Sequence, residues 1–172
     1  MSGVRIVDAA FLDELGGQAR ASPRGRRNFN FHASESESCN RLLNAVEPGS
    51  YVRPHRHLDP AKDETFVVVR GRFGFAAFDE TGRVTHAAVL VAGSDRCLVN
   101  VPHGTYHTLV ALEAGSVFFE AKGGPFVPLR EAEFAPWAPA ERSEGAGAYL
   151  ESLERMFRDA GGVKPSASAR KR

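Results

Sequence analysis

Histidine and carboxylate side chains occur in this chain at spacings that suit a metal site. His55 and His57 lie two residues apart in a strand-like stretch, and Glu64 opens a hydrophobic run seven residues later. Side chains two apart on a strand point to the same face, so His55 and His57 can converge on one point. His107 supplies a further imidazole just inside a later strand-like run. Imidazole and carboxylate together predict one divalent transition metal, and the residues leave its identity open among Zn, Fe, Ni and Mn.

The pair His55 and His57 also fits a second interpretation, two ordinary surface histidines on a strand. His86 and His103 are weaker candidates for chemistry. His86 lies in an expected strand with an exposed face, and His103 lies in a Pro-x-Gly turn. The metal hypothesis therefore depends on the whole set and not on one pair.

Two side chains near the histidine pair are candidates for a substrate cavity. If Pro54 adds no bulge, Tyr51 and Arg53 share the strand face of His55 and His57. Arg53 would then place a cation beside the metal, suited to a carboxylate or phosphate on a substrate. An arginine held in a structural ion pair at the mouth of a barrel explains the residue equally well.

Two further polar rows have two interpretations each. Asn28, Asn30 and His32 alternate with phenylalanines, so they form either the wet face of an edge strand or a polar row inside the cavity. In the cavity, His32 could support a metal ligand or act as a general base. Glu120 and Lys122 could be a structural ion pair or a pair that handles substrate.

The elements that must position these residues are short β-runs. Turn residues separate nine of them without intervening helices, which predicts an all-β sandwich or barrel. The expected runs are 28–32, 39–46, 51–57, 64–70, 72–79, 83–91, 96–101, 106–112 and 116–122.

A helix is expected at each end of this β-region. Asp8 resembles a helix N-cap, and the pair Gly16-Gly17 is expected to end or fray the first helix. Tyr149, Leu150, Leu153, Met156 and Phe157 form one apolar helical face near the other end. The predicted division is an N-terminal helix and linker at 1–23, a β-barrel domain at 24–141, a C-terminal helix at 142–162 and a disordered tail at 163–172.

Composition narrows the classes of protein. The 172 residues are 42% hydrophobic and 25% charged with a net charge of +1, which predicts a globular domain without a built-in attraction to nucleic acid. No apolar run approaches the roughly 18 residues of a membrane span. The N-terminus has no signal-peptide pattern, and two cysteines make no disulfide framework, so we expect a cytoplasmic protein that binds a small molecule.

The spacing of the candidate ligands resembles the two signature motifs of the cupin superfamily, in the right order. The first is Gly49-x5-His55-x-His57-x6-Glu64-x6-Gly71, and the second is Pro102-x-Gly104-x2-His107. Six residues precede the glutamate where the family usually has three or four. Arg96 and Ala111 replace the glycine and asparagine that begin and end the usual second motif. Neither departure affects a ligand position.

The wider chain resembles the WbuC-type cupin metalloproteins from about Arg24 to Leu153. This resemblance implies a double-stranded β-helix (jelly roll) with a metal inside and no known reaction. The family's name comes from bacterial O-antigen (lipopolysaccharide) gene clusters. The matching stretches include EPGSYVRPHRH, ETFVVVRGR, FDETGRV, VPHGTYHTLVAL, FFEAKGGPF and FAPWAPAE.

Three functions stay open: a small metalloenzyme, an Fe(II)-dependent dioxygenase among the possibilities; a non-catalytic barrel that binds metal and ligand; and a structural protein stabilised by its metal. Sugar-like or acidic molecules fit the mixture of candidate cavity residues. Cupins often pair through sheet edges, so we expect a homodimer.

Overall fold

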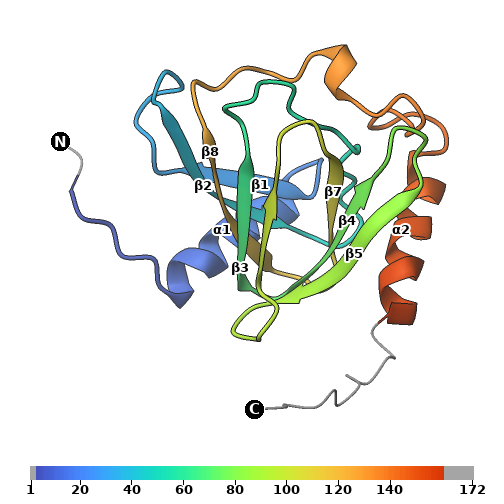
Figure 1. Cartoon of the computed structure of the whole chain (residues 1–172). Helices are drawn as coiled ribbons and strands as arrows, with labels where there is room; N and C mark the ends of the chain where they lie inside the picture. The colour runs from blue at the N-terminus through green and yellow to red at the C-terminus, as the bar shows by residue number, and fades with distance from the viewer. Residues whose placement is uncertain (1–2, 161–172) are drawn as a thin grey trace, which may run out of the picture.

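The computed structural model describes residues 3–160, which form two antiparallel β-sheets flanked by two helices (Figure 1). One sheet has the strand order β1-β2-β8-β3-β6 and the other has the order β5-β4-β7. The elements are α1 (Ala9–Ala21), β1 (Arg26–Asn30), β2 (Cys39–Val46), β3 (Glu64–Arg70), β4 (Arg72–Phe78), β5 (Val84–Val91), β6 (Leu98–Val101), β7 (Tyr106–Ala111), β8 (Ser116–Gly123), the short 3-10 helix Glu131–Glu133 and α2 (Ala146–Ala160). The architecture is the all-β jelly roll with short terminal helices that the sequence predicts.

The main core lies between the two sheets. Strand alternation sends Phe66 and Val68 of β3 inward, where they meet Phe73 and Phe75 of β4 and Phe118 of β8. Each of these five side chains is at most 7% exposed. This apolar filling occupies one part of the interior and leaves the polar candidates at one end of it.

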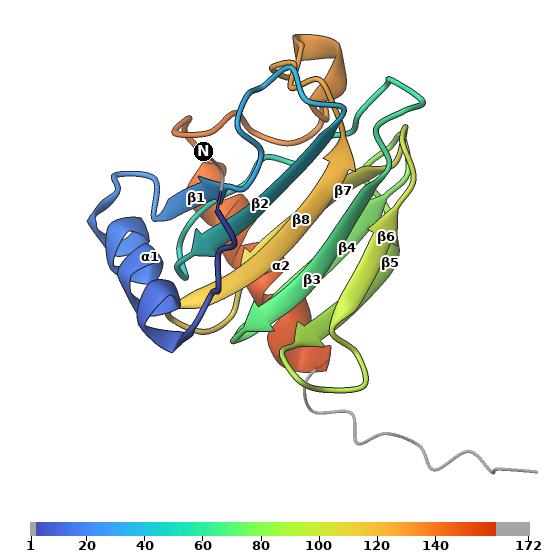
Figure 2. The same ribbon diagram turned by 90° about the vertical axis from the view of Figure 1, so that its left-hand side faces the viewer.

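Helix α1 packs on the outer face of the five-stranded sheet near its β1–β2 edge (Figure 2). Asp8 caps it by accepting a hydrogen bond from the backbone N–H of Phe11 at 2.9 Å. The expectation that Gly16-Gly17 ends the helix is wrong, because α1 continues to Ala21. Leu15 and Ala19 are buried against β2 and β8 on both sides of the glycine pair, and this packing offsets the low helix propensity of glycine.

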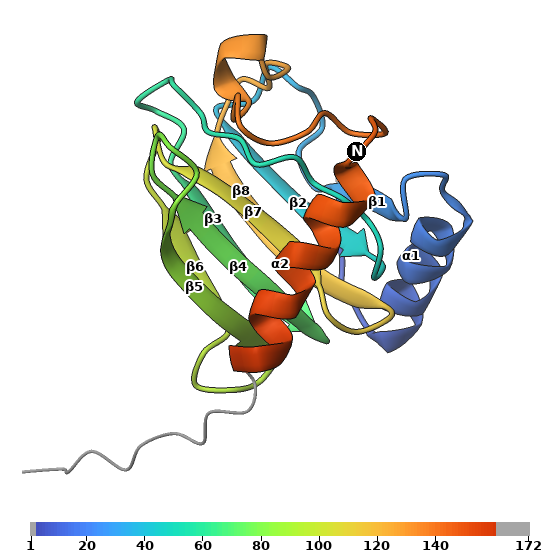
Figure 3. The ribbon, with the colours of Figure 1, turned by 90° about the vertical axis from the view of Figure 1, so that its right-hand side faces the viewer.

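Helix α2 lies across the outer face of the three-stranded sheet (Figure 3). Its apolar face buries Leu150, Leu153 and Phe157. Gly74 of β4 is required there, since a Cβ at this position would lie 2.1 Å from the Phe157 ring. The expected helix limit at residue 162 and the expected tail at 163–172 lie outside the described residues.

The segment Tyr51–His57 is not the strand that its sequence suggests. It is extended, but it forms only isolated bridges at His55, with His107 and with Phe134. Pro54 has no backbone N–H to donate to a ladder, which limits regular pairing here. Its carbonyl instead accepts a hydrogen bond from the Ala135 N–H at 2.9 Å.

Among residues 3–160, no helix is long and apolar enough to span a membrane.

Candidate metal centre

Backbone pairing places the candidate ligands on facing elements. The His55 N–H donates to the His107 carbonyl at 3.1 Å, and the His107 N–H donates to the His55 carbonyl at 2.9 Å. The two imidazole centroids are therefore only 4.7 Å apart. Glu64 is the first residue of β3 in the other sheet, and its side chain reaches across the interior toward them.

The structure groups three of the predicted ligands, and the fourth contacts one of them. One donor atom each from His55, His57 and Glu64 lies within 4.8 Å of the other two. His107 joins them, because its Nε2 lies 2.9 Å from Glu64 Oε2. His57, Glu64 and His107 are at most 6% exposed, and His55 is half-buried. A buried cluster of this kind is not a pair of surface histidines.

Two of the imidazoles are oriented by the backbone. His55 Nδ1 lies 3.0 Å from the Arg53 carbonyl, and His107 Nδ1 lies 2.9 Å from the Thr105 carbonyl. A carbonyl oxygen only accepts, so each Nδ1 carries the proton and donates. In each ring Nε2 is then the nitrogen that remains for a ligand contact, which is the arrangement found in metal-binding histidines.

The charge states also suit a metal. Burial, with a smaller contribution from His107, lowers the pKa of His55 to about 3, so this imidazole is neutral at pH 7. Burial alone would raise the pKa of Glu64, but the contacts with His107, His57 and the Lys122 ammonium hold it well below its ordinary value. Glu64 is therefore a carboxylate.

The two carboxylate oxygens of Glu64 differ in their hydrogen-bond partners. Its Oε1 lies 2.8 Å from His57 Nε2 and 2.9 Å from Lys122 Nζ. Its Oε2 is buried and accepts no hydrogen bond from any described residue, although His107 Nε2 is close. A buried carboxylate oxygen with no hydrogen-bond donor, facing imidazole nitrogens, fits a divalent transition metal.

A cavity of about 170 Å³ adjoins this cluster inside the barrel. Glu120 and Lys122 line it, as the cavity hypothesis requires, and Lys122 Nζ lies 2.9 Å from Glu120 Oε1. Asn44 donates to Glu120 Oε2 at 2.9 Å and was missed from the sequence. The sequence signal for Asn44 was strand alternation, which places it on the same face as Val46 in the run CNRLLNAV. The lining residues are Arg26, Asn44, Val46, Val52, His55, Glu64, Phe66, His107, Thr108, Leu109, Phe118, Glu120 and Lys122.

Tyr51 and Arg53 point elsewhere. The Tyr51 hydroxyl donates to the Pro139 carbonyl at 2.9 Å, and the ring packs in the cluster beneath α2. Arg53 donates to the Ala135 carbonyl at 3.0 Å and lies 3.4 Å from Glu131. Both side chains therefore hold the segment before β3 in place and do not line the cavity.

Asn28, Asn30 and His32 also lie outside the cavity lining. Asn28 donates to Asn30 at 2.7 Å, and both residues are exposed on the edge strand β1. His32 is buried, with its Nδ1 3.1 Å from both the backbone N–H and the carbonyl of Arg41. The His32 ring therefore pairs with the backbone of Arg41 where the ladder between β1 and β2 ends.

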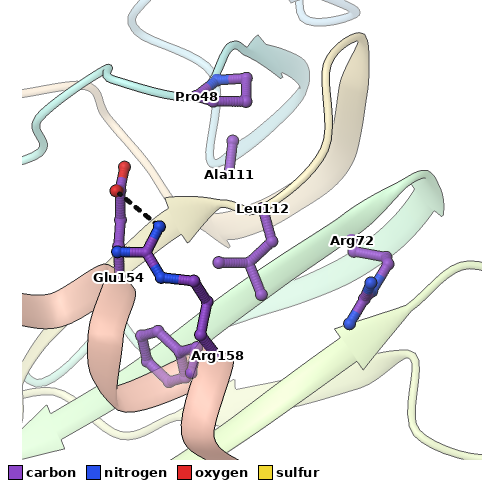
Figure 4. Close-up of a pocket in the computed structure, with 7 residues that line it drawn as sticks. Pro48, Arg72, Ala111, Leu112, Glu154 and Arg158 are labelled. Carbon is purple, nitrogen blue, oxygen red and sulfur yellow. Dashed lines mark ion pairs between the residues drawn. The ribbon is translucent and has the colours of Figure 1, made fainter. Parts of the chain in front are cut away.

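Two of the other hollows, both without a candidate ligand, lie at other places in the fold. One of about 360 Å³ lies at the far end of β7, between Arg72, Leu112 and the last turns of α2. There Arg158 turns toward Glu154 at 3.7 Å, and Arg72 lies on the other side of Leu112 (Figure 4). A larger, open groove of about 720 Å³ runs between the edge strands β5 and β6 and includes His86.

Comparisons with known proteins agree with the fold. A family model described as "Domain of unknown function (DUF6016)" matches residues 7–90. No curated protein matches the chain. The conserved protein SPY1581 of unknown function from Streptococcus pyogenes is similar at a TM-score of 0.50 and 11% identity, over 74% of this chain and 93% of that one.

Two further solved structures are similar at lower TM-scores. KdgF from Halomonas sp. has a TM-score of 0.47 and 21% identity, over 64% of this chain and 86% of that one. A mutant oxalate decarboxylase from Bacillus subtilis has a TM-score of 0.46 and 24% identity, over 59% of this chain. The matched part is 26% of the oxalate decarboxylase chain, so this chain spans about a quarter of that enzyme.

The jelly roll and its interior histidine–glutamate cluster together define the class. This is a jelly-roll β-barrel with a candidate metal centre.

Proposed function

We propose that the chain binds one divalent transition metal through His55, His57, Glu64 and His107, and that the metal holds a small polar molecule in the barrel. The observation that carries this proposal is the buried Glu64 Oε2, which faces His107 Nε2 at 2.9 Å without a hydrogen bond. The orientation of the His55 and His107 rings by the Arg53 and Thr105 carbonyls supports it.

The protein's own residues prepare the site in three ways. The Arg53 and Thr105 carbonyls fix two imidazole rings, and Lys122 holds the Glu64 carboxylate. Phe66, Leu109 and Phe118 form an apolar part of the cavity wall. A bound divalent ion would supply Lewis acidity to an oxygen of the molecule held there.

Metal analysis of the purified protein tests the proposal. Wild type prepared without chelator should contain about one equivalent of a single transition metal, and His57→Ala should lose it. His86→Ala is the matched control, because it removes an exposed imidazole outside the cluster. Absence of metal from wild type, even after reconstitution, would refute the proposal, and so would equal metal in His57→Ala.

The resemblance to WbuC-type cupins supports a narrower proposal, a role in bacterial surface-polysaccharide (O-antigen) biosynthesis. Deletion of the gene should change the electrophoretic pattern of the surface polysaccharide. Complementation with wild type should restore the pattern, and complementation with His57→Ala should not. An unchanged pattern after deletion would remove this role and leave the metal proposal intact.

A homodimer is the proposed assembly. Strand β5 is an edge strand of eight residues with the sequence VTHAAVLV, which contains no Lys, Arg, Asp, Glu or Pro. Edge strands in monomers are commonly protected by charge or proline. Beside it, Leu98 of the edge strand β6 is 53% exposed. A second copy of the chain would cover both edges.

A further inference from the structure

The cavity beside the metal centre changes from polar to apolar along its length. Strand register places Lys122 level with Glu64, next to the candidate ligands. One row further along, Glu120 lies level with Phe66, and Asn44 lies level with Phe118 in the row after that. Val46 closes this series on β2. A molecule held at the metal would therefore extend its body toward apolar walls.

The fixed charges around the cavity cancel without a metal. Glu64 and Glu120 carry the negative charges, and Lys122 and Arg26 carry the positive ones. Glu141, the ion-pair partner of Arg26, is also paired with Arg24. Glu141 therefore leaves no unpaired negative charge beside the cavity. The charge of a divalent ion would thus be uncompensated among the described lining residues. An uncompensated charge in a low-dielectric interior is strongly unfavourable, and an anionic ligand relieves it.

The volume limits the size of that anion. A cavity of about 170 Å³ is smaller than the sites of about 300–1,000 Å³ that take drug-sized ligands. A small organic acid fits this space, whereas a sugar nucleotide does not.

Among the described lining residues, the charged and amide groups at the far end of the cavity are already paired. Asn44 and Lys122 are already bonded to Glu120. The Arg26 guanidinium donates to Glu141 at 2.8 Å and to the Tyr51 carbonyl at 2.9 Å. The walls that remain are Val46, Val52, Phe66, Leu109 and Phe118.

We infer that the ligand of this site is a small monocarboxylic acid with an apolar body, its carboxylate at the metal centre and its body against Phe118 and Leu109. This inference rests on the proposed metal function, and it narrows the ligand from sugar-like or acidic molecules to one chemical class.

Calorimetry with defined probes tests the inference. Protein loaded with Mn²⁺ is titrated with 3-methylbutanoate, with the neutral isostere 3-methylbutanamide, with butanedioate and with glucose. The monocarboxylate should bind at least tenfold more tightly than each of the other three. Metal-free protein should lose this preference.

Two variants locate the binding in the cavity. Val46→Phe fills the apolar end, so it should lose the acid and keep about one equivalent of metal. Glu120→Gln removes a negative charge from the lining, so it should bind the acid several-fold more tightly. Because Glu120→Gln keeps the side-chain shape, it tests the inference even if Val46→Phe does not fold.

The outcomes separate this inference from the proposed function. If the protein holds its metal and the acid binds no better than the amide, butanedioate or glucose, the inference is wrong and the metal proposal stands. Unchanged acid binding in Val46→Phe would also overturn it. If no metal binds, the proposed function itself fails.

Discussion

Glu64 is the residue on which the candidate centre depends most. Its Oε1 is shared by His57 and Lys122, and its Oε2 faces His107. Glu64 is only 2% exposed, so these contacts lie in the interior of the barrel. The same carboxylate therefore has two roles, as a candidate metal ligand and as a partner that neutralises a buried ammonium.

Glu64→Gln separates these two roles, because it keeps the shape and removes the charge. We expect the variant to lose its metal. The metal-free variant should also unfold more readily than metal-free wild type, by about 1–3 kcal/mol, since a buried ion-pair partner is lost. Urea denaturation with chelator present measures the second effect. Glu80→Gln, an exposed carboxylate elsewhere, is the control, and equal stability of both variants would contradict the interpretation.

Asn40 lies in the same cross-strand row, level with Lys122, and is 1% exposed. Neither its amide nitrogen nor its amide oxygen has a hydrogen-bond partner among residues 3–160. Burying an unpaired amide costs about 1–3 kcal/mol, so Asn40→Leu should raise the free energy of unfolding by about that amount. Urea denaturation checks this, with the exposed Asn28→Leu as control. A loss of stability in Asn40→Leu would show that the amide is in fact satisfied.

At the scale of elements, the contact between β4 and α2 depends on one missing side chain. A Cβ at Gly74 would lie 2.1 Å from the Phe157 ring. Gly74→Ala should therefore destabilise the protein by about 1–3 kcal/mol, the usual range for overpacking. In a Phe157→Ala background the same change should have almost no effect, because the ring is gone. Equal losses in both backgrounds, measured by thermal unfolding, would refute this coupling.

The segment before α2 is tied to β1 by a carboxylate shared between two arginines. Glu141 Oε1 accepts from Arg24 Nε at 2.7 Å, and Glu141 Oε2 accepts from Arg26 at 2.8 Å. The Arg24 hydrogen bonds, and then the Arg26 charge, lower the pKa of Glu141 below its ordinary value of 4.5. A lowered folded-state pKa stabilises the fold above the ordinary value, and this contribution is lost as the pH falls through the folded-state pKa.

Glu141→Gln should therefore cost about 1 kcal/mol at pH 7, where the partly exposed pair is weakened by solvent. The difference from wild type should shrink toward zero as the pH falls below the ordinary value of 4.5 and through the lowered folded-state pKa, where the wild-type carboxyl group becomes protonated. Denaturation curves across this pH range provide the measurement. A difference that stays constant with pH would mean that the charge of Glu141 contributes nothing.

The elements differ in how well the sequence predicts them. The candidate ligands His55, His57, Glu64 and His107 can be predicted from the sequence because their spacing is local within two short motifs. The strand at Tyr51–His57 was predicted wrongly, because alternation describes side-chain faces and says nothing of the ladder that Pro54 interrupts. The predicted end of the first helix at Gly16-Gly17 was wrong, because tertiary packing outweighed helix propensity. Asn44 was missed because the sequence does not show which face of β2 is turned toward the cavity.

At the scale of the whole molecule, the unprotected edge strands predict self-association. Leu98→Lys places a charge in the exposed edge between β5 and β6, so it should convert the proposed dimer to a monomer. Light scattering after size-exclusion chromatography checks the mass of both forms. Leu58→Lys, a similarly exposed leucine outside that edge, is the control and should remain dimeric. A monomeric wild type would refute the assembly.

The reciprocal hydrogen bonds between His55 and His107 also bear on how the chain folds. They join residues that are far apart in sequence, so forming them requires the closure of a long loop, which is entropically unfavourable and tends to be slow. The four candidate ligands can meet only after that closure. A metal bound by all four would therefore have little affinity for the unfolded chain, and its binding energy would count toward holding the barrel closed.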